Sequence, residues 1–255
     1  MRACLDAGFD YLDTSVDYGD VEAFLGSAGI VEQRNVRVCA KVPRRDWPDG
    51  VDDALGRLRC SRVDTLMLHS ARAEDIRRPA VADRMAQMKR DGRAVRTGAS
   101  TYGIDNACRT LEQSWGDAVQ VEHSILNPSV VAALEHRKRP HQQIVVRSVL
   151  CKGLLTARRA HAALGDRRMA TTLDDLEACA LGWGFGSLAE LAIRFALDTG
   201  AVDVVLVGIA TRAELAVAMS AASRPPLDAA QRAALGAFDR SAEDWTHPER
   251  WTVPA

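Results

Sequence analysis

The stretch that decides the fold is VDTLMLHSARAEDIRRPAVADRMAQMKRDGRAVRTGAS, residues 63–100. It opens with a β-rich run (63–69), continues with apolar residues at helical spacing from Asp75 to Arg90, and closes with a second β-rich run (94–100). Strand, helix and strand in this order are typical of a parallel βαβ unit. The stretch therefore predicts an α/β protein built on a parallel sheet.

The same alternation continues on both sides of this stretch. Five more β-rich runs are FDYLDTS (9–15), VRVCAKV (36–42), AVQVEHS (118–124), QIVVRSVL (143–150) and VDVVLVG (202–208). Helical segments are predicted at Thr211 to Ala222, at 173–184 and at 187–200, the last with Ser187 as N-cap and Glu190 in the capping-box position. Because the runs are largely apolar, we expect helices to cover both faces of the sheet. The prediction is seven βα units in one domain, residues 1–255.

Composition excludes several classes of function. The 255 residues are 47% hydrophobic and 26% charged, with a net charge of -1, as in a soluble globular protein. Arginine-rich spots at 43–45, 77–78, 136–140, 158–159 and 167–168 are short and balanced by acids, so no nucleic-acid partner is predicted. The six cysteines form no CxxC pair and no Cys/His cluster at metal spacing, which predicts reduced thiols and no metal. With no signal region and no long apolar run, we expect a cytoplasmic protein without a membrane partner.

Four polar residues stand at or just beyond the ends of predicted strands. They are Asp13 in YLDTS, Tyr18 in VDYGD, Lys41 in VCAKV and His69 in LMLHS. Parallel barrels keep their chemistry at the carboxyl ends of the strands. A cation beside a phenol lowers the pKa of the phenol, and a carboxylate holds the cation in place. The four residues therefore predict a proton-transfer site with Tyr18 as its acid.

Taken together, these segments resemble the aldo-keto reductase family. The resemblance extends from AGFDYLDTSVDYGDVEAFLG through the Lys41 and His69 strands and VRTGASTYG to VVRSVLCKGLL and VDVVLVGIATRAEL. It implies a (β/α)8 TIM-type barrel in which Tyr18 protonates a carbonyl oxygen as hydride arrives from a nicotinamide. His69 would orient that carbonyl, while Lys41 and Asp13 would tune the tyrosine.

The resemblance also implies that the family's first strand is absent, because only seven βα units are found. Either the start codon is assigned too late or the barrel has a gap. A gap would expose two strand edges, which a second copy of the chain or the segment EDWTHPERWTVPA (243–255) could cover. That segment is equally well interpreted as a loop over the substrate mouth.

The residues at the family's cofactor-binding positions match the family pattern to different degrees. Ser100 and Gln120 match residues that hold the nicotinamide carboxamide. Arg147 stands where an aromatic side chain often stacks on the ring, and an arginine plane can also stack. The residues that match the loop beside the pyrophosphate are Ser148, Leu150 and Gly153.

The adenosine side matches the family less well. Gly208 and the helix opening after it match the loop facing the 2'-phosphate and adenine. Arg212 is the nearby cation, but Glu214 occupies the position of a basic residue and would repel a phosphate unless it held a ribose hydroxyl. We therefore expect NADP(H), bound weakly.

Three functions remain open from the sequence. The first is NADP-dependent reduction of a small aldehyde, ketone or sugar-like carbonyl. The second is a cofactor-independent lyase, dehydratase or isomerase that kept the four residues, and the third is a non-catalytic barrel. Trp47, Trp245 and Trp251 are candidate apolar walls of a substrate pocket.

Overall fold

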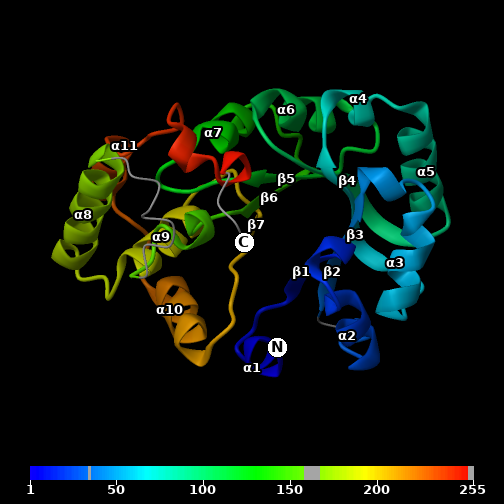
Figure 1. Cartoon of the computed structure of the whole chain (residues 1–255), viewed down its shortest axis with the longest axis horizontal. Coiled ribbons are helices and arrows are strands. Elements are labelled where there is room, and N and C mark those ends of the chain that lie inside the picture. Colours follow the sequence, from blue (N-terminus) through cyan, green and yellow to red (C-terminus); the bar gives the residue numbers. More distant parts are fainter. Residues whose placement is uncertain (34–35, 158–166, 252–255) are drawn as a thin grey trace. The chain divides into compact units, whose positions relative to one another are not determined.

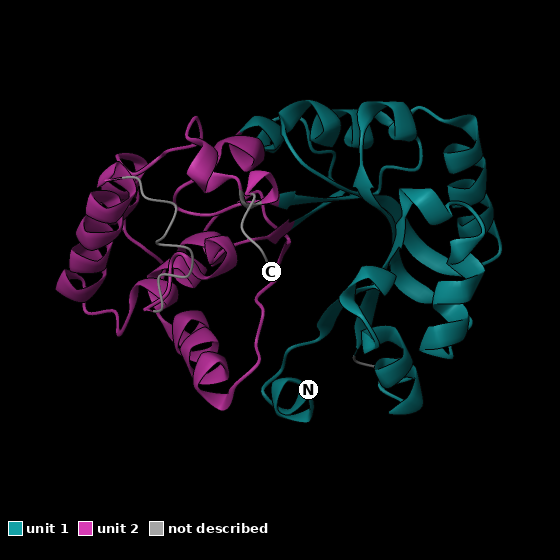
Figure 2. Ribbon diagram, viewed as in Figure 1, with its two compact units in different colours: residues 1–121, 133–145 teal, residues 122–132, 146–255 magenta. Residues whose placement is uncertain are grey.

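The structure is a computed structural model that describes residues 1–33, 36–157 and 167–251 (Figure 1). The chain divides into two compact units, residues 1–121 with 133–145 and residues 122–132 with 146–255 (Figure 2). The arginine pair at 158–159 and the last four residues of the predicted cover at 243–255 lie outside the described residues. A single domain over 1–255 stays a prediction.

The strands form a parallel sheet, as predicted. The first unit holds β1 (Tyr11–Ser15), β2 (Arg37–Pro43), β3 (Val63–Ala71) and β4 (Ala94–Thr101), all paired in parallel. Strands β5 (Ala118–Glu122) and β6 (Gln143–Arg147) pass from the first unit into the second, which contains β7 (Val204–Val205). In the described residues the seven strands follow one another in chain order. This is a TIM-type α/β fold with seven strands.

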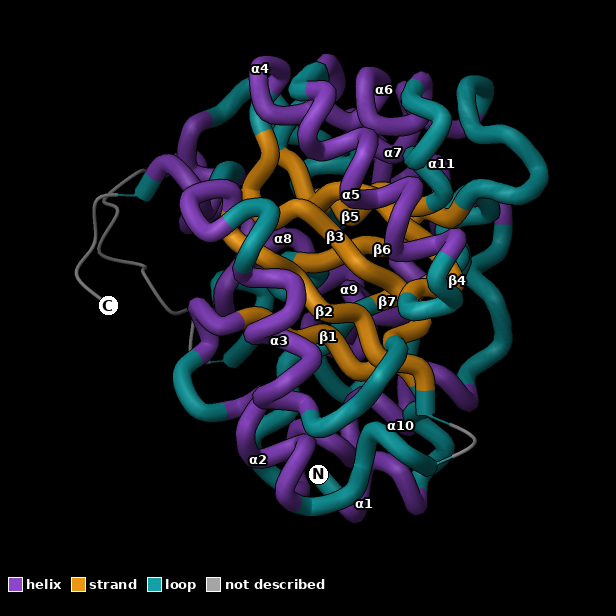
Figure 3. Tube along the Cα trace, turned by 90° about the vertical axis from the view of Figure 1, so that its right-hand side faces the viewer, coloured by secondary structure: helices purple, strands orange, loops and turns teal. Residues whose placement is uncertain are grey.

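Helices of the first unit pack against its strands. They are α1 (Arg2–Asp6), η1 (Val16–Tyr18), α2 (Val21–Ser27), η2 (Arg44–Asp46), α3 (Gly50–Leu58), α4 (Ala73–Ile76), α5 (Pro79–Arg90) and α6 (Ile104–Glu112). Helices α2 and α3 lie beside β1 and β2 (Figure 3). Apolar side chains such as Leu25, Val42 and Leu66 form one core between these layers. Burial of nearly every residue of β2, β4 and β5 agrees with strands covered on both faces.

The predicted helical segment from Asp75 to Arg90 is two helices. It breaks before Pro79, which is the first residue of α5, and Arg78 has an extended backbone with ψ of 125°. Proline lacks an N–H and disfavours helical geometry in the residue before it. Predicting one continuous helix here was therefore wrong, for a reason that the sequence contains.

The second unit is mainly helical. Its elements are η3 (Cys151–Gly153), α8 (Arg167–Gly182), α9 (Leu188–Leu197), α10 (Arg212–Ser223), α11 (Ala229–Gly236), η5 (Asp244–Thr246) and η6 (Pro248–Arg250); α7 (Ser129–Glu135) spans both units. Ser187 caps α9 as predicted, since its Oγ accepts from the Glu190 N–H at 3.2 Å. The Glu190 carboxylate instead accepts from the Gly186 N–H at 2.6 Å, so the capping box is incomplete. None of the helices in the described ranges has both the length and the apolar character needed to cross a bilayer.

Gly98 is required by the close pairing of β4 with β5. A Cβ at this position would lie 1.9 Å from the carbonyl oxygen of Ala118, its partner in the register. We expect Gly98→Ala to reduce the free energy of unfolding by about 3 kcal/mol or more, because backbone must move. The matched control is Gly56→Ala in α3, where nothing lies within 4 Å. That change should stabilise by about 0.5–1 kcal/mol. Urea denaturation checks both, and equal midpoints for the two variants would contradict the close approach.

Candidate active site

The first unit brings together all four residues predicted to carry the chemistry. Asp13 lies on β1, and Tyr18 ends η1, which Ser15 caps by accepting from the Asp17 N–H at 3.3 Å. Lys41 lies on β2, opposite Ser15 in the register, and His69 lies on β3 opposite Pro43. These positions are at the carboxyl ends of adjacent parallel strands, the edge at which barrels place their sites.

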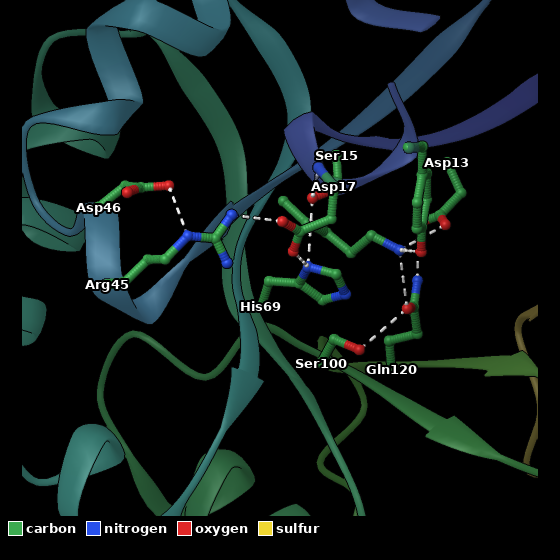
Figure 4. Close-up of polar contacts among 10 residues, drawn as sticks. Asp13, Ser15, Asp17, Arg45, Asp46, His69, Ser100 and Gln120 are labelled. Carbon is green, nitrogen blue, oxygen red and sulfur yellow. Dashed lines mark hydrogen bonds and ion pairs between the residues drawn. The ribbon is translucent and has the colours of Figure 1, made fainter. Parts of the chain in front are cut away.

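Lys41 is the centre of the site. Its Nζ donates to Asp13 Oδ2 at 2.6 Å, to Tyr18 Oη at 2.6 Å and to Gln120 Oε1 at 3.3 Å (Figure 4). The ammonium has three hydrogens, so all are engaged. Burial lowers the pKa of Lys41, but Asp13, together with smaller contributions from Cys39 and Tyr18, outweighs burial, and the pKa lies above its ordinary value. A buried cation is thus held beside the phenol, as predicted.

Ser100 and Gln120 join the same network. Ser100 Oγ donates to Gln120 Oε1 at 3.0 Å, and Gln120 Nε2 donates to Asp13 Oδ1 at 2.7 Å (Figure 4). The Gln120 amide therefore bridges the carboxylate and the ammonium. It keeps one N–H and Ser100 keeps its lone pairs, so both retain hydrogen-bonding capacity for a ligand.

His69 is held by two residues outside the predicted site, Ser15 and Asp17. Its Nδ1 lies 3.0 Å from Asp17 Oδ2 and 3.1 Å from Ser15 Oγ. The imidazole meets the Tyr18 ring edge-on, with 6.0 Å between centroids. Burial, helped by the charge of Lys41, lowers the pKa of His69. The imidazole is therefore neutral at neutral pH.

Asp17 is in turn fixed by Arg45 of η2. Arg45 Nη2 donates to Asp17 Oδ1 at 2.5 Å, and Arg45 Nε lies 3.6 Å from Asp46 Oδ2 (Figure 4). Burial opposes ionisation of Asp17, but Arg45 and His69 outweigh it and hold the pKa of Asp17 below its ordinary value. In the sequence, the pair could have been noticed only as a carboxylate directly before Tyr18 and an arginine just after the Lys41 strand.

The remaining predicted residues lie in the second unit. Arg147 Nη2 lies 3.8 Å from Glu122 Oε2, and Arg147 Nη1 donates to Ser148 Oγ at 3.4 Å. The backbone after Arg147 is unusual, since Ser148, Cys151, Lys152 and Gly153 all have φ between 47° and 90°. Non-glycine residues in this region are strained, and such strain gathers at ligand sites. The loop was predicted from the family resemblance, and its role in cofactor binding stays a prediction.

A cleft in the second unit contains three predicted cofactor positions. It has a volume of about 280 Å³, and its lining includes Leu150, Gly208 and Glu214. Small residues such as Ala157 and Ala189 also line it and leave it open to a ligand. Arg212 is exposed in the first turn of α10 and is not part of this lining.

Glu214 occupies the amino end of α10. Its Oε2 accepts from the N–H groups of Ala210 at 2.8 Å and Thr211 at 2.9 Å, while the Glu214 N–H donates to Thr211 Oγ1. The N–H groups at the start of a helix can bind an anion. In this capping box the Glu214 carboxylate already accepts from the N–H groups of Ala210 and Thr211.

The predicted tryptophan walls are mostly core residues. Trp47 is 6% exposed and packs in the core of the first unit, and Trp245 is 7% exposed in that of the second. Trp251 is partly buried against the second core, with Lys152 Nζ 5.9 Å from its ring centroid. Burial in the cores is therefore a sufficient explanation for Trp47 and Trp245.

Glu122, His247 and Glu249 are potential metal ligands that the sequence did not bring together. Their ligand atoms lie within 4.8 Å of one another in the described residues. Arg147 lies near Glu122, Arg250 Nε lies 3.8 Å from Glu249 Oε1, and His247 Nε2 is 2.7 Å from the Ser241 carbonyl. Arginine side chains already lie beside the two carboxylates, and a carbonyl oxygen lies beside the imidazole. We therefore assign no metal to this cluster, and the absence of a metal stays a prediction.

Comparison with solved structures confirms the fold. The chain superimposes on aldo-keto reductase AKR11C1 from Bacillus halodurans with a TM-score of 0.78 and 22% identity, covering 94% of this chain and 85% of that one. For glycerol dehydrogenase AKR11B4 from Gluconobacter oxydans the TM-score is 0.76 at 19% identity, with 93% and 83% covered. The thermostable aldo-keto reductase Tm1743, in complex with epalrestat, gives 0.73 at 19% identity, with 93% and 85% covered. No curated protein sequence shows a significant match.

Family membership follows from the sequence profile. The profile described as "Aldo/keto reductase family" matches residues 1–240, which is most of the chain. The segments that resembled the family are spread over the same range. The chain therefore belongs to the aldo/keto reductase family of oxidoreductases.

Proposed function

We propose that the chain reduces a small carbonyl compound, an aldehyde, ketone or sugar-like carbonyl, with a nicotinamide dinucleotide as reductant. The observation that carries the proposal is the Lys41 ammonium, which lies 2.6 Å from both a phenol and a carboxylate. A phenol supported in this way can give its proton to an oxygen on which negative charge develops.

Tyr18 is the proton donor in this proposal. Tyr18 is 43% exposed, and its Oη already accepts the Lys41 hydrogen bond, so its own hydrogen remains for a ligand. A carbonyl oxygen bound there takes the Tyr18 proton as the carbonyl carbon is reduced. Lys41 stabilises the oxygen left negative on Tyr18, and Asp13 keeps the ammonium charged and in place.

The described residues offer groups that fit a nicotinamide dinucleotide. When bound, it supplies the hydride. Ser100 and the remaining N–H of Gln120 would hold the carboxamide. In the second unit, Gly153 in the loop after Arg147 and Gly208 in the lining of the cleft are glycines, which let a backbone approach a phosphate closely.

Glu214 makes NADP(H) the less favoured form of this cofactor. The family resemblance implies NADP(H), but the amino end of α10 already carries the Glu214 carboxylate. Barrels frequently bind phosphate with the loops after their last strands and a helix N-terminus. The 2'-phosphate of NADP(H) at α10 would meet the negative charge of Glu214 and N–H groups that already donate to it. The ribose hydroxyl of NAD(H) would instead meet the Glu214 carboxylate as a hydrogen-bond acceptor.

Titration with NADH and NADPH tests the proposal, followed by tryptophan fluorescence and calorimetry. We expect micromolar binding of NADH and weaker binding of NADPH. Glu214→Gln keeps an acceptor without the charge, and should strengthen NADPH binding about two- to fivefold with NADH unchanged, the effect of one charge at a helix N-terminus. The matched control is Glu190→Gln, a carboxylate near the start of α9. Equal effects of Glu214→Gln on both dinucleotides would contradict the assignment.

Reduction is then measured over a panel of aldehydes, ketones and sugars. One structural neighbour is named a glycerol dehydrogenase, so small polyols and the carbonyl compounds related to them by oxidation belong in the panel. Reduction of at least one compound is expected. Failure of both dinucleotides to bind at millimolar concentration would instead favour cofactor-independent acid/base chemistry at Tyr18.

A further inference from the structure

The tautomer of His69 is determined by its neighbours. Asp17 is ionised, because Arg45 holds its pKa low, and an ionised carboxylate only accepts hydrogen bonds. His69 Nδ1, 3.0 Å from Asp17 Oδ2, must therefore carry the hydrogen. Ser15 Oγ, at 3.1 Å, can accept from the same N–H.

A neutral imidazole has a single N–H. Since Nδ1 carries it, Nε2 has a lone pair and accepts hydrogen bonds. In the part of the chain that the structure describes, Nε2 makes no hydrogen bond and is not one of the buried polar atoms lacking a partner. Figure 4 shows this second ring nitrogen directed away from Asp17. His69 thus presents an accessible acceptor beside the Tyr18 ring.

An acceptor cannot bind a carbonyl oxygen, which is itself an acceptor. The carbonyl oxygen has a donor in Tyr18 Oη, which keeps its hydrogen while accepting from Lys41. His69 Nε2 requires a donor on the substrate, and a hydroxyl on the carbon next to the carbonyl supplies one. The Tyr18 and His69 rings are neighbours, with 6.0 Å between their centroids, and an α-hydroxy carbonyl compound carries its two oxygens on adjacent carbons.

We propose that Asp17 is a positioning residue that fixes His69 as the Nδ1–H tautomer, and that His69 Nε2 accepts a hydrogen bond from a hydroxyl adjacent to the reacting carbonyl. The substrate is therefore an α-hydroxy carbonyl compound. This inference rests on the proposed reductase function and names its substrate class. It differs from the expectation that His69 orients the carbonyl itself.

The charges around His69 define the pH range of this arrangement. Asp17 and Arg45 face it from η1 and η2, Lys41 from β2, and Asp13 from β1, while Tyr18 meets its ring. Protonation would give Nε2 a hydrogen and turn the acceptor into a donor. Because the pKa of His69 is lowered, the acceptor form is present at neutral pH and is lost only as the pH falls below the ordinary value of about 6.5.

The first test observes the tautomer without any substrate. In ¹⁵N-labelled full-length protein at pH 7.5, long-range ¹H–¹⁵N correlation should show His69 protonated at Nδ1 and unprotonated at Nε2. Asp17→Ala should redistribute the tautomers, and Asp17→Asn, which keeps the shape of the side chain, serves if Asp17→Ala folds poorly. Asp46→Ala is the matched control, because Asp46 contacts Arg45 but not His69. Protonation at Nε2 in the unmodified chain would overturn the inference.

The second test compares glyceraldehyde with propanal, which have the same carbon skeleton. We expect kcat/KM to favour glyceraldehyde by about tenfold, because propanal leaves a polar group of the site unpaired. Asp17→Ala should bring this ratio close to one, whereas Asp46→Ala should preserve it. Equal rates for the two aldehydes in the unmodified chain would reject the substrate class and leave the reductase function standing. If no carbonyl compound is reduced, the proposed function fails and the substrate class with it.

Discussion

Tyr18→Phe is expected to lower kcat/KM for carbonyl reduction by about 100- to 10,000-fold, the usual contribution of a general acid. The hydroxyl is the only group at this position that both accepts from Lys41 and can donate to a carbonyl oxygen. Dinucleotide affinity should change little, since the variant removes one oxygen. Steady-state kinetics over the carbonyl panel, with binding measured in parallel, provides the readout.

Tyr11→Phe is the matched control for Tyr18→Phe. Tyr11 also belongs to the β1 region, but its hydroxyl donates to Thr65 Oγ1 at 3.4 Å, away from Lys41. Activity should stay within about twofold of the unmodified chain, since the Tyr11 hydroxyl is partnered by Thr65 and makes no hydrogen bond to Lys41 in the described residues. If Tyr18→Phe retained full activity, Tyr18 would not be the acid, and a non-catalytic role for the four residues would gain weight.

Lys41→Met is expected to abolish measurable reduction and also to destabilise the protein. The Lys41 side chain is fully buried, and its partner Asp13 has a side chain only 16% exposed. Removing the cation leaves a largely buried carboxylate whose remaining partner is the Gln120 amide. Breaking such a pair typically costs about 3–5 kcal/mol. Urea denaturation measures the loss of stability, and kinetics measures the loss of activity.

A double variant separates the two effects of Lys41→Met. Asp13→Asn combined with Lys41→Met removes the stranded charge, so much of the stability should return while activity stays absent. Lys89→Met is the exposed control: Lys89 Nζ lies 2.6 Å from Asp117 Oδ2, with 37% of its side chain exposed. That pair should contribute less than about 1 kcal/mol. Recovery of activity in the double variant would refute the role given to Lys41.

The elements of the fold were predictable because apolar periodicity repeats along the chain. The seven strands are where the β-rich runs indicated, and Asp13, Tyr18 and Lys41 converge as the strand ends required. The contact between Asp17 and His69 was not predictable, because it depends on the turn of η1 and on the register of β3. A shift of one residue would direct either side chain elsewhere.

The role of Gln120 illustrates the same limit. Its position on β5 follows from the sequence, but its amide contacts depend on distances between strands that pattern cannot give. The strain between Ser148 and Gly153 was equally hidden, since Ser148, Cys151 and Lys152 are residues that rarely adopt positive φ. A glycine at each of these three positions would have indicated positive φ from the sequence, but of the four residues only Gly153 is a glycine.

The bridge made by Gln120 has a consequence for the order of events in the catalytic cycle. A carboxamide that bonds to Ser100 or to the remaining N–H of Gln120 contacts an amide that also bonds to Asp13 and Lys41. Binding of a ligand at one end of the amide and the hydrogen bonds of Gln120 with Asp13 and Lys41 at the other end are then thermodynamically linked, and the linkage is reciprocal. A dinucleotide bound first would therefore adjust the hydrogen bonds around Lys41, and so prepare the acid before the carbonyl arrives.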